Sequence, residues 1–273
     1  MTILQGAILG FIQGLGEFLP VSSSGHLLLA RLHMGIGAED PAFKMLDILL
    51  HVGTLLPVLI IFWREWIDMI AHPIRNRTLL LLFVASLPAL LFYVVFDLDV
   101  FDNGWFLGVS FLITAVLLLI TEKVSRRTGR TTSDKPGIKH ALCMGVMQGF
   151  GLLPGISRSG STITGGVVSG LNRKAAAKFS FMMSAPAIAA SLLVEGKHAL
   201  DEGLLSHLAL VPTLVGIAVA AVTGWLAIRF MLKLISRRTL LGFALYVAVL
   251  GLVCLVLQLT GSPLMPAFAV PAV

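Results

Sequence analysis

The sequence predicts an all-α polytopic membrane protein with six full transmembrane helices and two re-entrant helical hairpins, arranged as an inverted-topology repeat. Three observations predict this fold: an apolar composition, apolar runs of membrane-spanning length, and one polar motif that occurs twice. Of the 273 residues, 57% are hydrophobic and only 12% are charged, whereas about 25% of the residues in soluble domains are charged. The composition therefore excludes a soluble globular protein.

Six apolar runs are long enough to cross a bilayer core, which takes about 20 helical residues. They cover residues 42–63, 78–97, 104–122, 175–195, 206–231 and 239–260. Two further apolar regions, 3–33 and 138–172, are each interrupted by a stretch rich in Gly, Ser and Pro. Irregular backbone at membrane depth is tolerated only where protein or a water-filled cavity satisfies its polar groups. We therefore predict that each of these two regions is a re-entrant hairpin.

The net charge of +6 does not indicate nucleic-acid binding, because the basic residues gather in short loops between apolar runs. An excess of Lys and Arg is typical of cytoplasmic loops. The loops expected in the cytoplasm contain Arg64, Arg75, Arg77, Lys123, Arg126, Arg127, Arg130, Lys135, Lys139, Arg173, Lys174, Lys178, Arg229, Lys233, Arg237 and Arg238. The alternate loops contain Glu39, Asp40, Asp97, Asp99, Asp102, Glu195, Asp201 and Glu202, with Arg31, Lys44 and Lys197 as bases nearby. This pattern predicts that the alternate loops and both termini lie outside.

The two interrupted regions repeat one motif. A shift of 135 residues aligns GFIQGLGEFLPVSSSG (10–25) with GVMQGFGLLPGISRSG (145–160), and seven of the sixteen positions are identical. Each half then holds one hairpin followed by three spans, and an odd number of crossings inverts the second half. We predict one membrane domain over 1–273, with halves of about 1–132 and 136–263. In such repeats the site lies where the interrupted helices meet.

Each interruption ends in small polar residues directly before a helical run, SSSG at 22–25 and SRSG at 157–160. Such residues are favoured helix N-caps. Two helix N-termini that converge offer N–H groups and positive dipole ends to an anion. Arg158, the one base outside the loops, adds a planar guanidinium suited to bidentate contact with a phosphate. The alternative is a structural Arg158 paired with a carboxylate or with carbonyl groups.

Gln13 and Glu17 precede the first interruption and, four residues apart, share one helix face. A carboxylate in apolar surroundings needs a cation, a metal or a proton. Glu17 is therefore predicted to act as a general base or as a Mg²⁺ ligand together with substrate phosphates, and the alternative is a lone ion pair with Arg158. His26 follows the serines, and a Ser/His pair can supply a nucleophile with a general acid or base.

Two other patterns have simpler interpretations. Asp47 and His51 also lie four residues apart, and they either line the same cavity or bond each other. Stripes of small residues let a second helix approach closely. These stripes consist of Gly6, Gly10 and Gly14 in the first half and Gly145 and Gly149 in the second.

Three stretches of the chain resemble motifs of the undecaprenyl-diphosphate phosphatase family, the bacitracin-resistance membrane phosphatases of bacteria. QGLGE at 13–17 is similar to the family's (E/Q)xxxE motif, and it runs into FLPVSSSGH at 18–26, which completes the family's EFLPVSSxGH. PGISRSGST at 154–162 matches PGxSRSGxT, and LHVGTL at 50–55 is similar to LHxGTL. The resemblance covers nearly the whole chain. Many members carry Glu where this chain has Gln13, which weakens the case for a metal site with two carboxylates.

The resemblance implies hydrolysis of undecaprenyl diphosphate to undecaprenyl phosphate and phosphate, which recycles the lipid carrier of peptidoglycan synthesis and confers bacitracin resistance. It implies that Glu17 activates the nucleophile or binds Mg²⁺ or Ca²⁺, that Ser23 is the nucleophile, and that His26 shuttles the proton. Arg158 would hold the diphosphate. Whether a phosphoserine forms or water attacks directly is left open, as is the choice of serine. The implied substrate-binding residues are Gln13, Ser22, Ser24, Ser157, Ser159, Gly160 and Thr162.

The expected partners are the polyprenyl diphosphate substrate and membrane lipid, without nucleic acid, and a homodimer is left open. The expected location is the bacterial inner membrane, with the site open to the periplasmic face. Another class of membrane phosphatase, the type 2 phosphatidic acid phosphatases, has an SR-x5-H motif that requires His where this chain has Thr164, so that class is excluded. The alternative function is a transporter or flippase of a polyprenyl phosphate lipid, because inverted repeats and midplane sites are transporter features.

Overall fold

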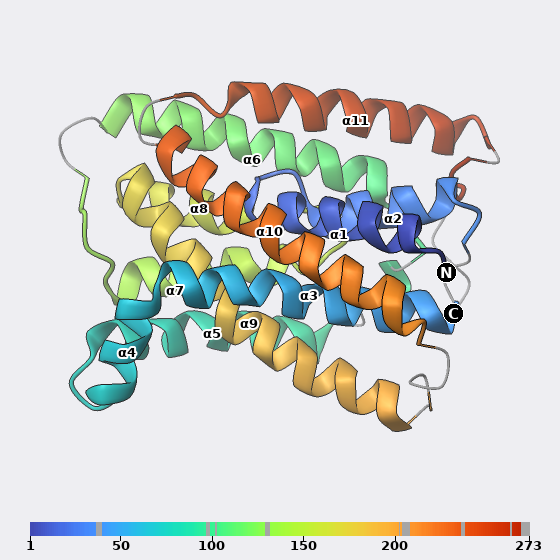
Figure 1. The fold of residues 1–273 in the computed structure, drawn as a ribbon. Helices are drawn as coiled ribbons and strands as arrows, with labels where there is room; N and C mark the ends of the chain where they lie inside the picture. Colours follow the sequence, from blue (N-terminus) through green and yellow to red (C-terminus); the bar gives the residue numbers. More distant parts are fainter. Residues whose placement is uncertain are drawn as a thin grey trace.

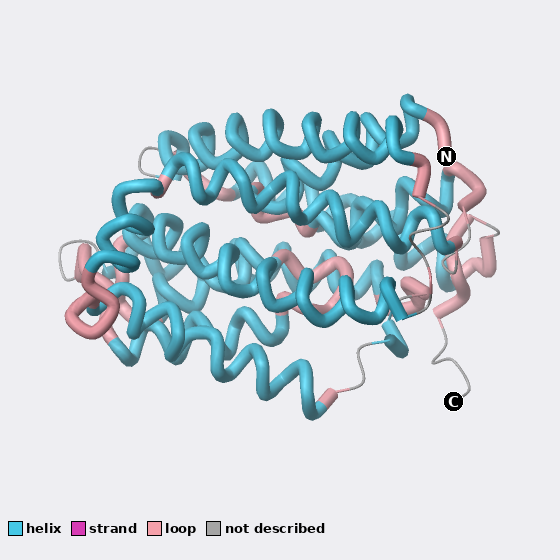
Figure 2. Tube along the Cα trace, turned by 60° about the horizontal axis from the view of Figure 1, so that its bottom comes forward, coloured by secondary structure: helices cyan, strands magenta, loops and turns pink. Residues whose placement is uncertain are grey.

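The computed structural model of the protein is a bundle of helices, most of which run side by side (Figures 1 and 2). It describes residues 1–36, 40–96, 99–101, 103–128, 132–201, 203, 208–235, 238–262 and 264–268. Within these residues no β-strand is present beyond an isolated bridge between Ser133 and Leu171, so the predicted all-helical class is confirmed. The helices are α1 (Ile3–Phe18), α2 (Ser23–His33), α3 (Pro41–Ile61), α4 (Trp63–Ala71), α5 (Arg77–Val95), the 3₁₀ turn η1 (Asp99–Phe101), α6 (Leu107–Thr128), α7 (Ile138–Phe150), α8 (Arg158–Val168), α9 (Arg173–Asp201), α10 (Leu210–Ile235) and α11 (Leu241–Leu259).

Five helices are individually long and apolar enough to cross a membrane, and they correspond to five of the six predicted spans. These helices are α5, α6, α9, α10 and α11. The chain is thus a multi-pass membrane protein. Some charged loop residues used above to orient it lie outside the described residues, namely Glu39, Asp97, Asp102, Arg130, Glu202 and Arg237.

The predicted span 42–63 ends earlier than expected. Helix α3 stops at Ile61, and the chain bends by 80° into α4. Helix α4 was not predicted, because it is too short to form a spanning run. Its Trp63, Ile67 and Ile70 are exposed and recur at helical spacing, which is typical of an amphipathic helix in the membrane interface.

Glycines bring α1 against α10, and α7 against α5, at backbone contact distance. A Cβ atom added to Gly10 would lie 2.2 Å from the carbonyl oxygen of Gly216, and one added to Gly145 would lie 2.3 Å from that of Ala85. These close approaches confirm that the glycine stripes serve helix packing. In both cases the hairpin of one half packs against the second full span that follows the hairpin of the other half: α1 against α10, and α7 against α5.

Gly145→Ala is expected to lower the free energy of unfolding by about 1–3 kcal/mol, because the added methyl group meets a backbone atom of α5 that only a helix shift can clear. Thermal denaturation in detergent micelles measures the loss. Gly196→Ala in α9 is the matched control, since a Cβ atom there meets nothing within 4 Å and alanine favours a helix by up to about 1 kcal/mol. Equal melting temperatures for the two variants would contradict the packing role.

Each interrupted region forms two helices joined by a short turn, α1 with α2 and α7 with α8. The packing inside the two pairs is the same. A Cβ atom added to Gly16 would lie 2.7 Å from Cα of Ser23, and one added to Gly151 would lie 2.7 Å from Cα of Arg158. Ser23 and Arg158 therefore occupy equivalent positions, each against the end of the preceding helix, at the 135-residue offset of the sequence motif.

The two turns also contact each other. A Cβ atom added to Gly25 would lie 2.8 Å from Cα of Gly155, and one added to Gly160 would lie 3.4 Å from Cβ of Pro20. This crosswise contact brings residues from both turns to one place. The opposite orientation of the halves in the membrane, their boundaries and the outside termini stay predictions.

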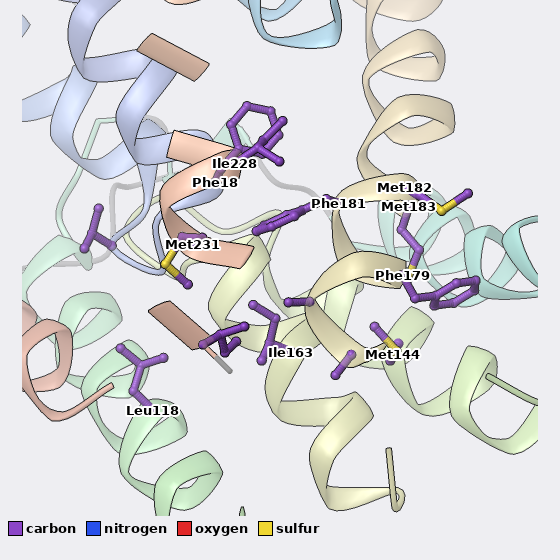
Figure 3. Close-up of a cluster of buried hydrophobic side chains, with 14 of the residues drawn as sticks. Phe18, Leu118, Met144, Ile163, Phe179, Phe181, Met182, Met183, Ile228 and Met231 are labelled. Atoms are coloured by element: carbon purple, nitrogen blue, oxygen red, sulfur yellow. The ribbon is translucent and has the colours of Figure 1, made fainter. Parts of the chain in front are cut away.

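A core of buried apolar side chains from several helices fills the interior of the bundle (Figure 3). It draws Phe18 from α1, Ile163 from α8, Phe181 from α9 and Met231 from α10. The rings of Phe18 and Phe181 meet edge to face, with centroids 5.7 Å apart. The core thus fixes the end of α1, and with it the neighbouring Glu17.

Candidate active site

Glu17 is the centre of a buried hydrogen-bond network at the end of α1. Its Oε2 atom accepts hydrogen bonds from Ser23 Oγ at 2.8 Å and from Gln13 Nε2 at 3.2 Å. Its Oε1 atom accepts one from Arg158 Nη2 at 2.7 Å, and the Glu17 residue is only 6% exposed. The structure therefore brings together three of the four residues that the sequence nominates as catalytic, together with Gln13.

The turn that delivers Ser23 is held in a strained conformation. Ser22 has a φ of 72°, a positive value that no other non-glycine residue of the described chain adopts. Its hydroxyl caps α2 by accepting a hydrogen bond from Gly25 N at 3.3 Å, and its carbonyl accepts one from His26 Nδ1 at 2.7 Å. Strain of this kind costs about 1–3 kcal/mol and is found mainly at functional sites. Here it sets Ser23, the first residue of α2, against Glu17.

Arg158 is the first residue of α8, and one of its buried nitrogens has no hydrogen-bond partner in the part of the chain that the structure describes. While Nη2 donates to Glu17, Nη1 is buried and has no hydrogen-bond partner among the described residues, and the same is true of Gln13 Oε1. Buried polar atoms are almost always paired. Arg173 also has buried nitrogens, Nε and Nη2, without a partner within the described ranges. The unpaired donor of Arg158 differs because it lies where the two hairpin turns meet, beside Glu17 and Ser23, and this position favours a place for a ligand.

The second turn is held by Thr114 of α6, a residue that the sequence analysis missed. Thr114 Oγ1 accepts a hydrogen bond from Ser157 N at 2.9 Å and donates one to the carbonyl oxygen of Gly155 at 2.9 Å. Ser157 in turn caps α8 by accepting a hydrogen bond from Gly160 N at 3.1 Å. Nothing in the sequence distinguishes Thr114 from other hydroxyl residues in apolar spans. Its role arises because α6 packs beside α8.

The hydroxyls of Ser159 and Thr162 hold the turns in place. Ser159 Oγ donates to the carbonyl oxygen of Leu19 at 3.1 Å, which ties the two turns together. Thr162 Oγ1 donates to the carbonyl oxygen of Arg158 at 2.8 Å and lies 2.6 Å from Ser180 Oγ. Both residues are buried; Thr162 supports the first turn of α8 at Arg158, and Ser159 joins that turn to the first hairpin. Their direct contact with substrate, and that of Ser22, Ser24, Ser157 and Gly160, stays a prediction.

His26 lies on the open side of the site and does not contact Glu17. Its Nε2 atom lies 2.7 Å from the hydroxyl of Tyr246 on α11, and the two rings stack with centroids 5.7 Å apart. A third ring, that of Phe111, meets His26 edge to face. Tyr246 is 220 residues away in sequence, and no motif identified it.

The Asp47 and His51 pair divides between two roles. The carboxylate of Asp47 pairs with Arg31 of α2, which is buried although the sequence analysis counted it among the bases near an outside loop. His51 Nδ1 bonds the backbone carbonyl of Asp47 at 2.8 Å rather than its carboxylate. Asp47 therefore joins α2 to α3.

The site offers one carboxylate to a metal ion. In the described part of the chain, no group of three or more His, Cys, Asp and Glu residues is placed to hold a metal. The oxygen donors that do lie together are the Glu17 carboxylate, Ser23 Oγ and the unpaired Gln13 Oε1. A hard divalent cation is commonly bound by one or two carboxylates plus substrate phosphates, so this set fits such an ion only when the substrate completes it.

The site buries a carboxylate, a hydroxyl and a guanidinium together where two capped helices begin. This combination defines a membrane-embedded protein equipped for hydrolytic chemistry on an anionic group. Residues 6–253 match the family model of the bacitracin resistance protein BacA. An undecaprenyl-diphosphatase of Carboxydothermus hydrogenoformans is 40% identical over 267 residues, which are 96% of this chain and 100% of that protein. Undecaprenyl-diphosphatases of Halothermothrix orenii and Rubrobacter xylanophilus are 38% and 37% identical over 94% and 90% of this chain, and over 98% and 94% of their own lengths. The chain belongs to the bacitracin resistance protein BacA family.

Proposed function

We propose that this protein hydrolyses undecaprenyl diphosphate to undecaprenyl phosphate and inorganic phosphate, and so recycles the lipid carrier of cell-wall synthesis and confers bacitracin resistance. The observation that carries the proposal is the hydrogen-bonded set Glu17, Ser23 and Arg158, whose unpaired Nη1 offers a donor to a phosphate oxygen. The names of its relatives supply the substrate. A transporter of the same lipid would also need an anion site, but it would not need an acid bonded to a serine.

Ser23 is assigned as the nucleophile, because its hydroxyl already donates to Glu17 at 2.8 Å. Glu17 takes the Ser23 proton as Oγ attacks the terminal phosphorus. The bond from that phosphorus to the bridging oxygen breaks, and undecaprenyl phosphate leaves. Arg158 balances the charge on the phosphoryl oxygens. Water then attacks the same phosphorus and the P–Oγ bond breaks, while Glu17 returns its proton to Ser23 Oγ and the proton lost by the water passes to His26. Direct attack by water, activated by Glu17, is the alternative route.

Mg²⁺ or Ca²⁺ is proposed as the cofactor, held by Glu17 and Gln13 Oε1 and by the phosphates of the substrate. When bound, such an ion would neutralise phosphate charge and polarise the P–O bonds. Gln13 positions Glu17 whether or not the ion is present, through the hydrogen bond from its Nε2 atom.

Phosphate release from undecaprenyl diphosphate by the purified protein in detergent tests the function. Turnover by the wild type, lost in Ser23→Ala, supports the proposal, and a ³²P-labelled protein trapped by acid quench identifies the serine route. Tight binding or translocation of the lipid without phosphate release would favour the transporter. Labelled phosphate release without a labelled protein would favour direct attack by water.

The site is proposed to open to the periplasmic face of the inner membrane, with both termini on that side. A cysteine introduced at Lys135 is expected to react with a membrane-impermeant maleimide only after the cytoplasm is opened, because basic loops face inward. A cysteine at the exposed Leu264 is expected to react in cells with only the outer membrane permeabilised. The reverse pattern of labelling would overturn the proposed topology.

A further inference from the structure

A shallow apolar groove of about 410 Å³ runs along one face of α11. Its lining residues recur at spacings of three and four, as expected for a single stripe on a helix. Helix α11 carries no charged residue, and the hydroxyl of Tyr246 is the one side-chain polar group of the lining. The lining residues are Gly242, Leu245, Tyr246, Val249, Leu250 and Val253.

Tyr246 connects this groove directly to the catalytic site. His26 Nδ1 faces the carbonyl oxygen of Ser22 at 2.7 Å, and a carbonyl only accepts, so Nδ1 carries the proton of the neutral ring. His26 Nε2 is then the acceptor, and the Tyr246 hydroxyl donates to it at 2.7 Å. One residue of the groove lining, Tyr246, is therefore hydrogen-bonded to a residue of the proposed mechanism.

The groove also lies on the accessible side of the site. Glu17, Ser23 and Ser157 are buried, whereas Ser24 is exposed and Tyr246 is 49% exposed. A ligand that places its phosphates against Arg158 must therefore extend past Ser24 and His26. An aliphatic chain that leaves this point can meet the groove at Tyr246, within a lining that extends from Gly242 to Val253.

We propose that the α11 groove binds the isoprene units next to the diphosphate of the lipid substrate, and that Tyr246 positions His26 from the wall of the groove. This inference rests on the proposed function and adds to it the path of the lipid tail. The position of the groove favours the lipid tail as its occupant. The substrate joins a diphosphate to an aliphatic chain, and these two parts match the guanidinium of Arg158 and the aliphatic surface of α11. Bulk membrane lipid and a second copy of the chain have no such link to His26.

Filling the groove tests the path of the tail. Val249→Trp is expected to lower kcat/KM for farnesyl and undecaprenyl diphosphate about tenfold, through KM, because it blocks an apolar pocket. Activity on isopentenyl diphosphate, whose single isoprene unit stops short of Val249, should not change. Val222→Trp on α10 is the matched control, since Val222 is similarly exposed at 60% against 52% for Val249. Equal losses on short and long substrates, or no loss on either, would overturn the proposal.

A binding experiment tests the path of the lipid tail independently of phosphate release. A non-hydrolysable farnesyl methylenediphosphonate with a photoreactive group on its second isoprene unit is expected to label α11, and Val249→Trp should remove the label. Labelling of α11 by a wild type that releases no phosphate would overturn the hydrolase but support the groove. Labelling elsewhere, or equal labelling by a neutral farnesyl probe, would assign the groove to bulk lipid and overturn the inference.

Tyr246→Phe tests the link to His26. The ring stays in the groove while the hydroxyl is lost, so kcat is expected to fall about tenfold to a hundredfold because His26 is less well oriented, with little change in KM or melting temperature. Tyr93→Phe on α5 is the matched control, because the chain's other tyrosine is similarly exposed at 46%. An unchanged kcat in Tyr246→Phe would remove Tyr246 from its positioning role.

Discussion

Arg158→Lys is expected to reduce kcat by about 10²–10³ while the fold persists. The guanidinium donates to Glu17 through Nη2 and keeps Nη1 unpaired beside it, so it can bond a carboxylate and a phosphate at once. A lysine ammonium is a compact point charge that lacks this planar fork. Loss of one donor to the charge that develops in a transition state typically costs this much. Phosphate release from undecaprenyl diphosphate measures the effect.

Arg173→Lys is the matched control for this change. Arg173 is also mostly buried and also pairs with a buried acid, Glu122, at 3.3 Å, but it begins α9 beyond the far end of α8. Its replacement is expected to affect stability and leave kcat unchanged. Near-normal turnover in Arg158→Lys, or an equal loss in Arg173→Lys, would remove the special role of Arg158.

Glu17→Gln is expected to lower kcat by about 10²–10⁴ and also to destabilise the protein. The amide keeps the size of the carboxylate but cannot take a proton from Ser23, and general bases contribute rate factors of this size. Arg158 would then lose its counter-ion inside the protein, where breaking a buried pair costs about 3–5 kcal/mol. Phosphate release and thermal denaturation in detergent separate the two effects.

Glu65→Gln is the control for the loss of stability expected in Glu17→Gln. Glu65 pairs with Lys178, but both side chains are much more exposed than those of Glu17 and Arg158. Exposed ion pairs contribute about 0–1 kcal/mol, so this variant should melt close to the wild type and retain activity. A Glu17→Gln protein that releases phosphate at the wild-type rate would exclude Glu17 as the base.

The helices and the two turns could be predicted because their signals are local. Apolar runs predicted α5, α6, α9, α10 and α11 closely, since a membrane span needs only length and hydrophobicity. The N-caps Ser22 and Ser157 could be read from the residues that follow them, because a cap bonds within its own turn. Gln13 and Glu17 could be paired for the same reason, as helix neighbours four residues apart.

Other parts of the site depend on contacts between distant segments. Thr114 of α6 holds the second turn, and Tyr246 of α11 holds His26. In the sequence, each looks like an ordinary residue of an apolar span. Arg31 was counted as a loop base, although its pairing with Asp47 buries it. The bend between α3 and α4 was also missed, because α4 is too short and too polar to stand out as an apolar run.

The membrane class, the repeated motif and the identity of the acid, the serine and the guanidinium can all be read from the chain, because caps, spans and helix faces follow from bonds within a few residues. Three features of the site came only from the folded arrangement: Glu17 bonds both Ser23 and Arg158, Arg158 keeps Nη1 unpaired, and His26 faces Tyr246. The position of one helix N-terminus against another follows from close packing at glycines such as Gly25 and Gly155, which joins segments 130 residues apart.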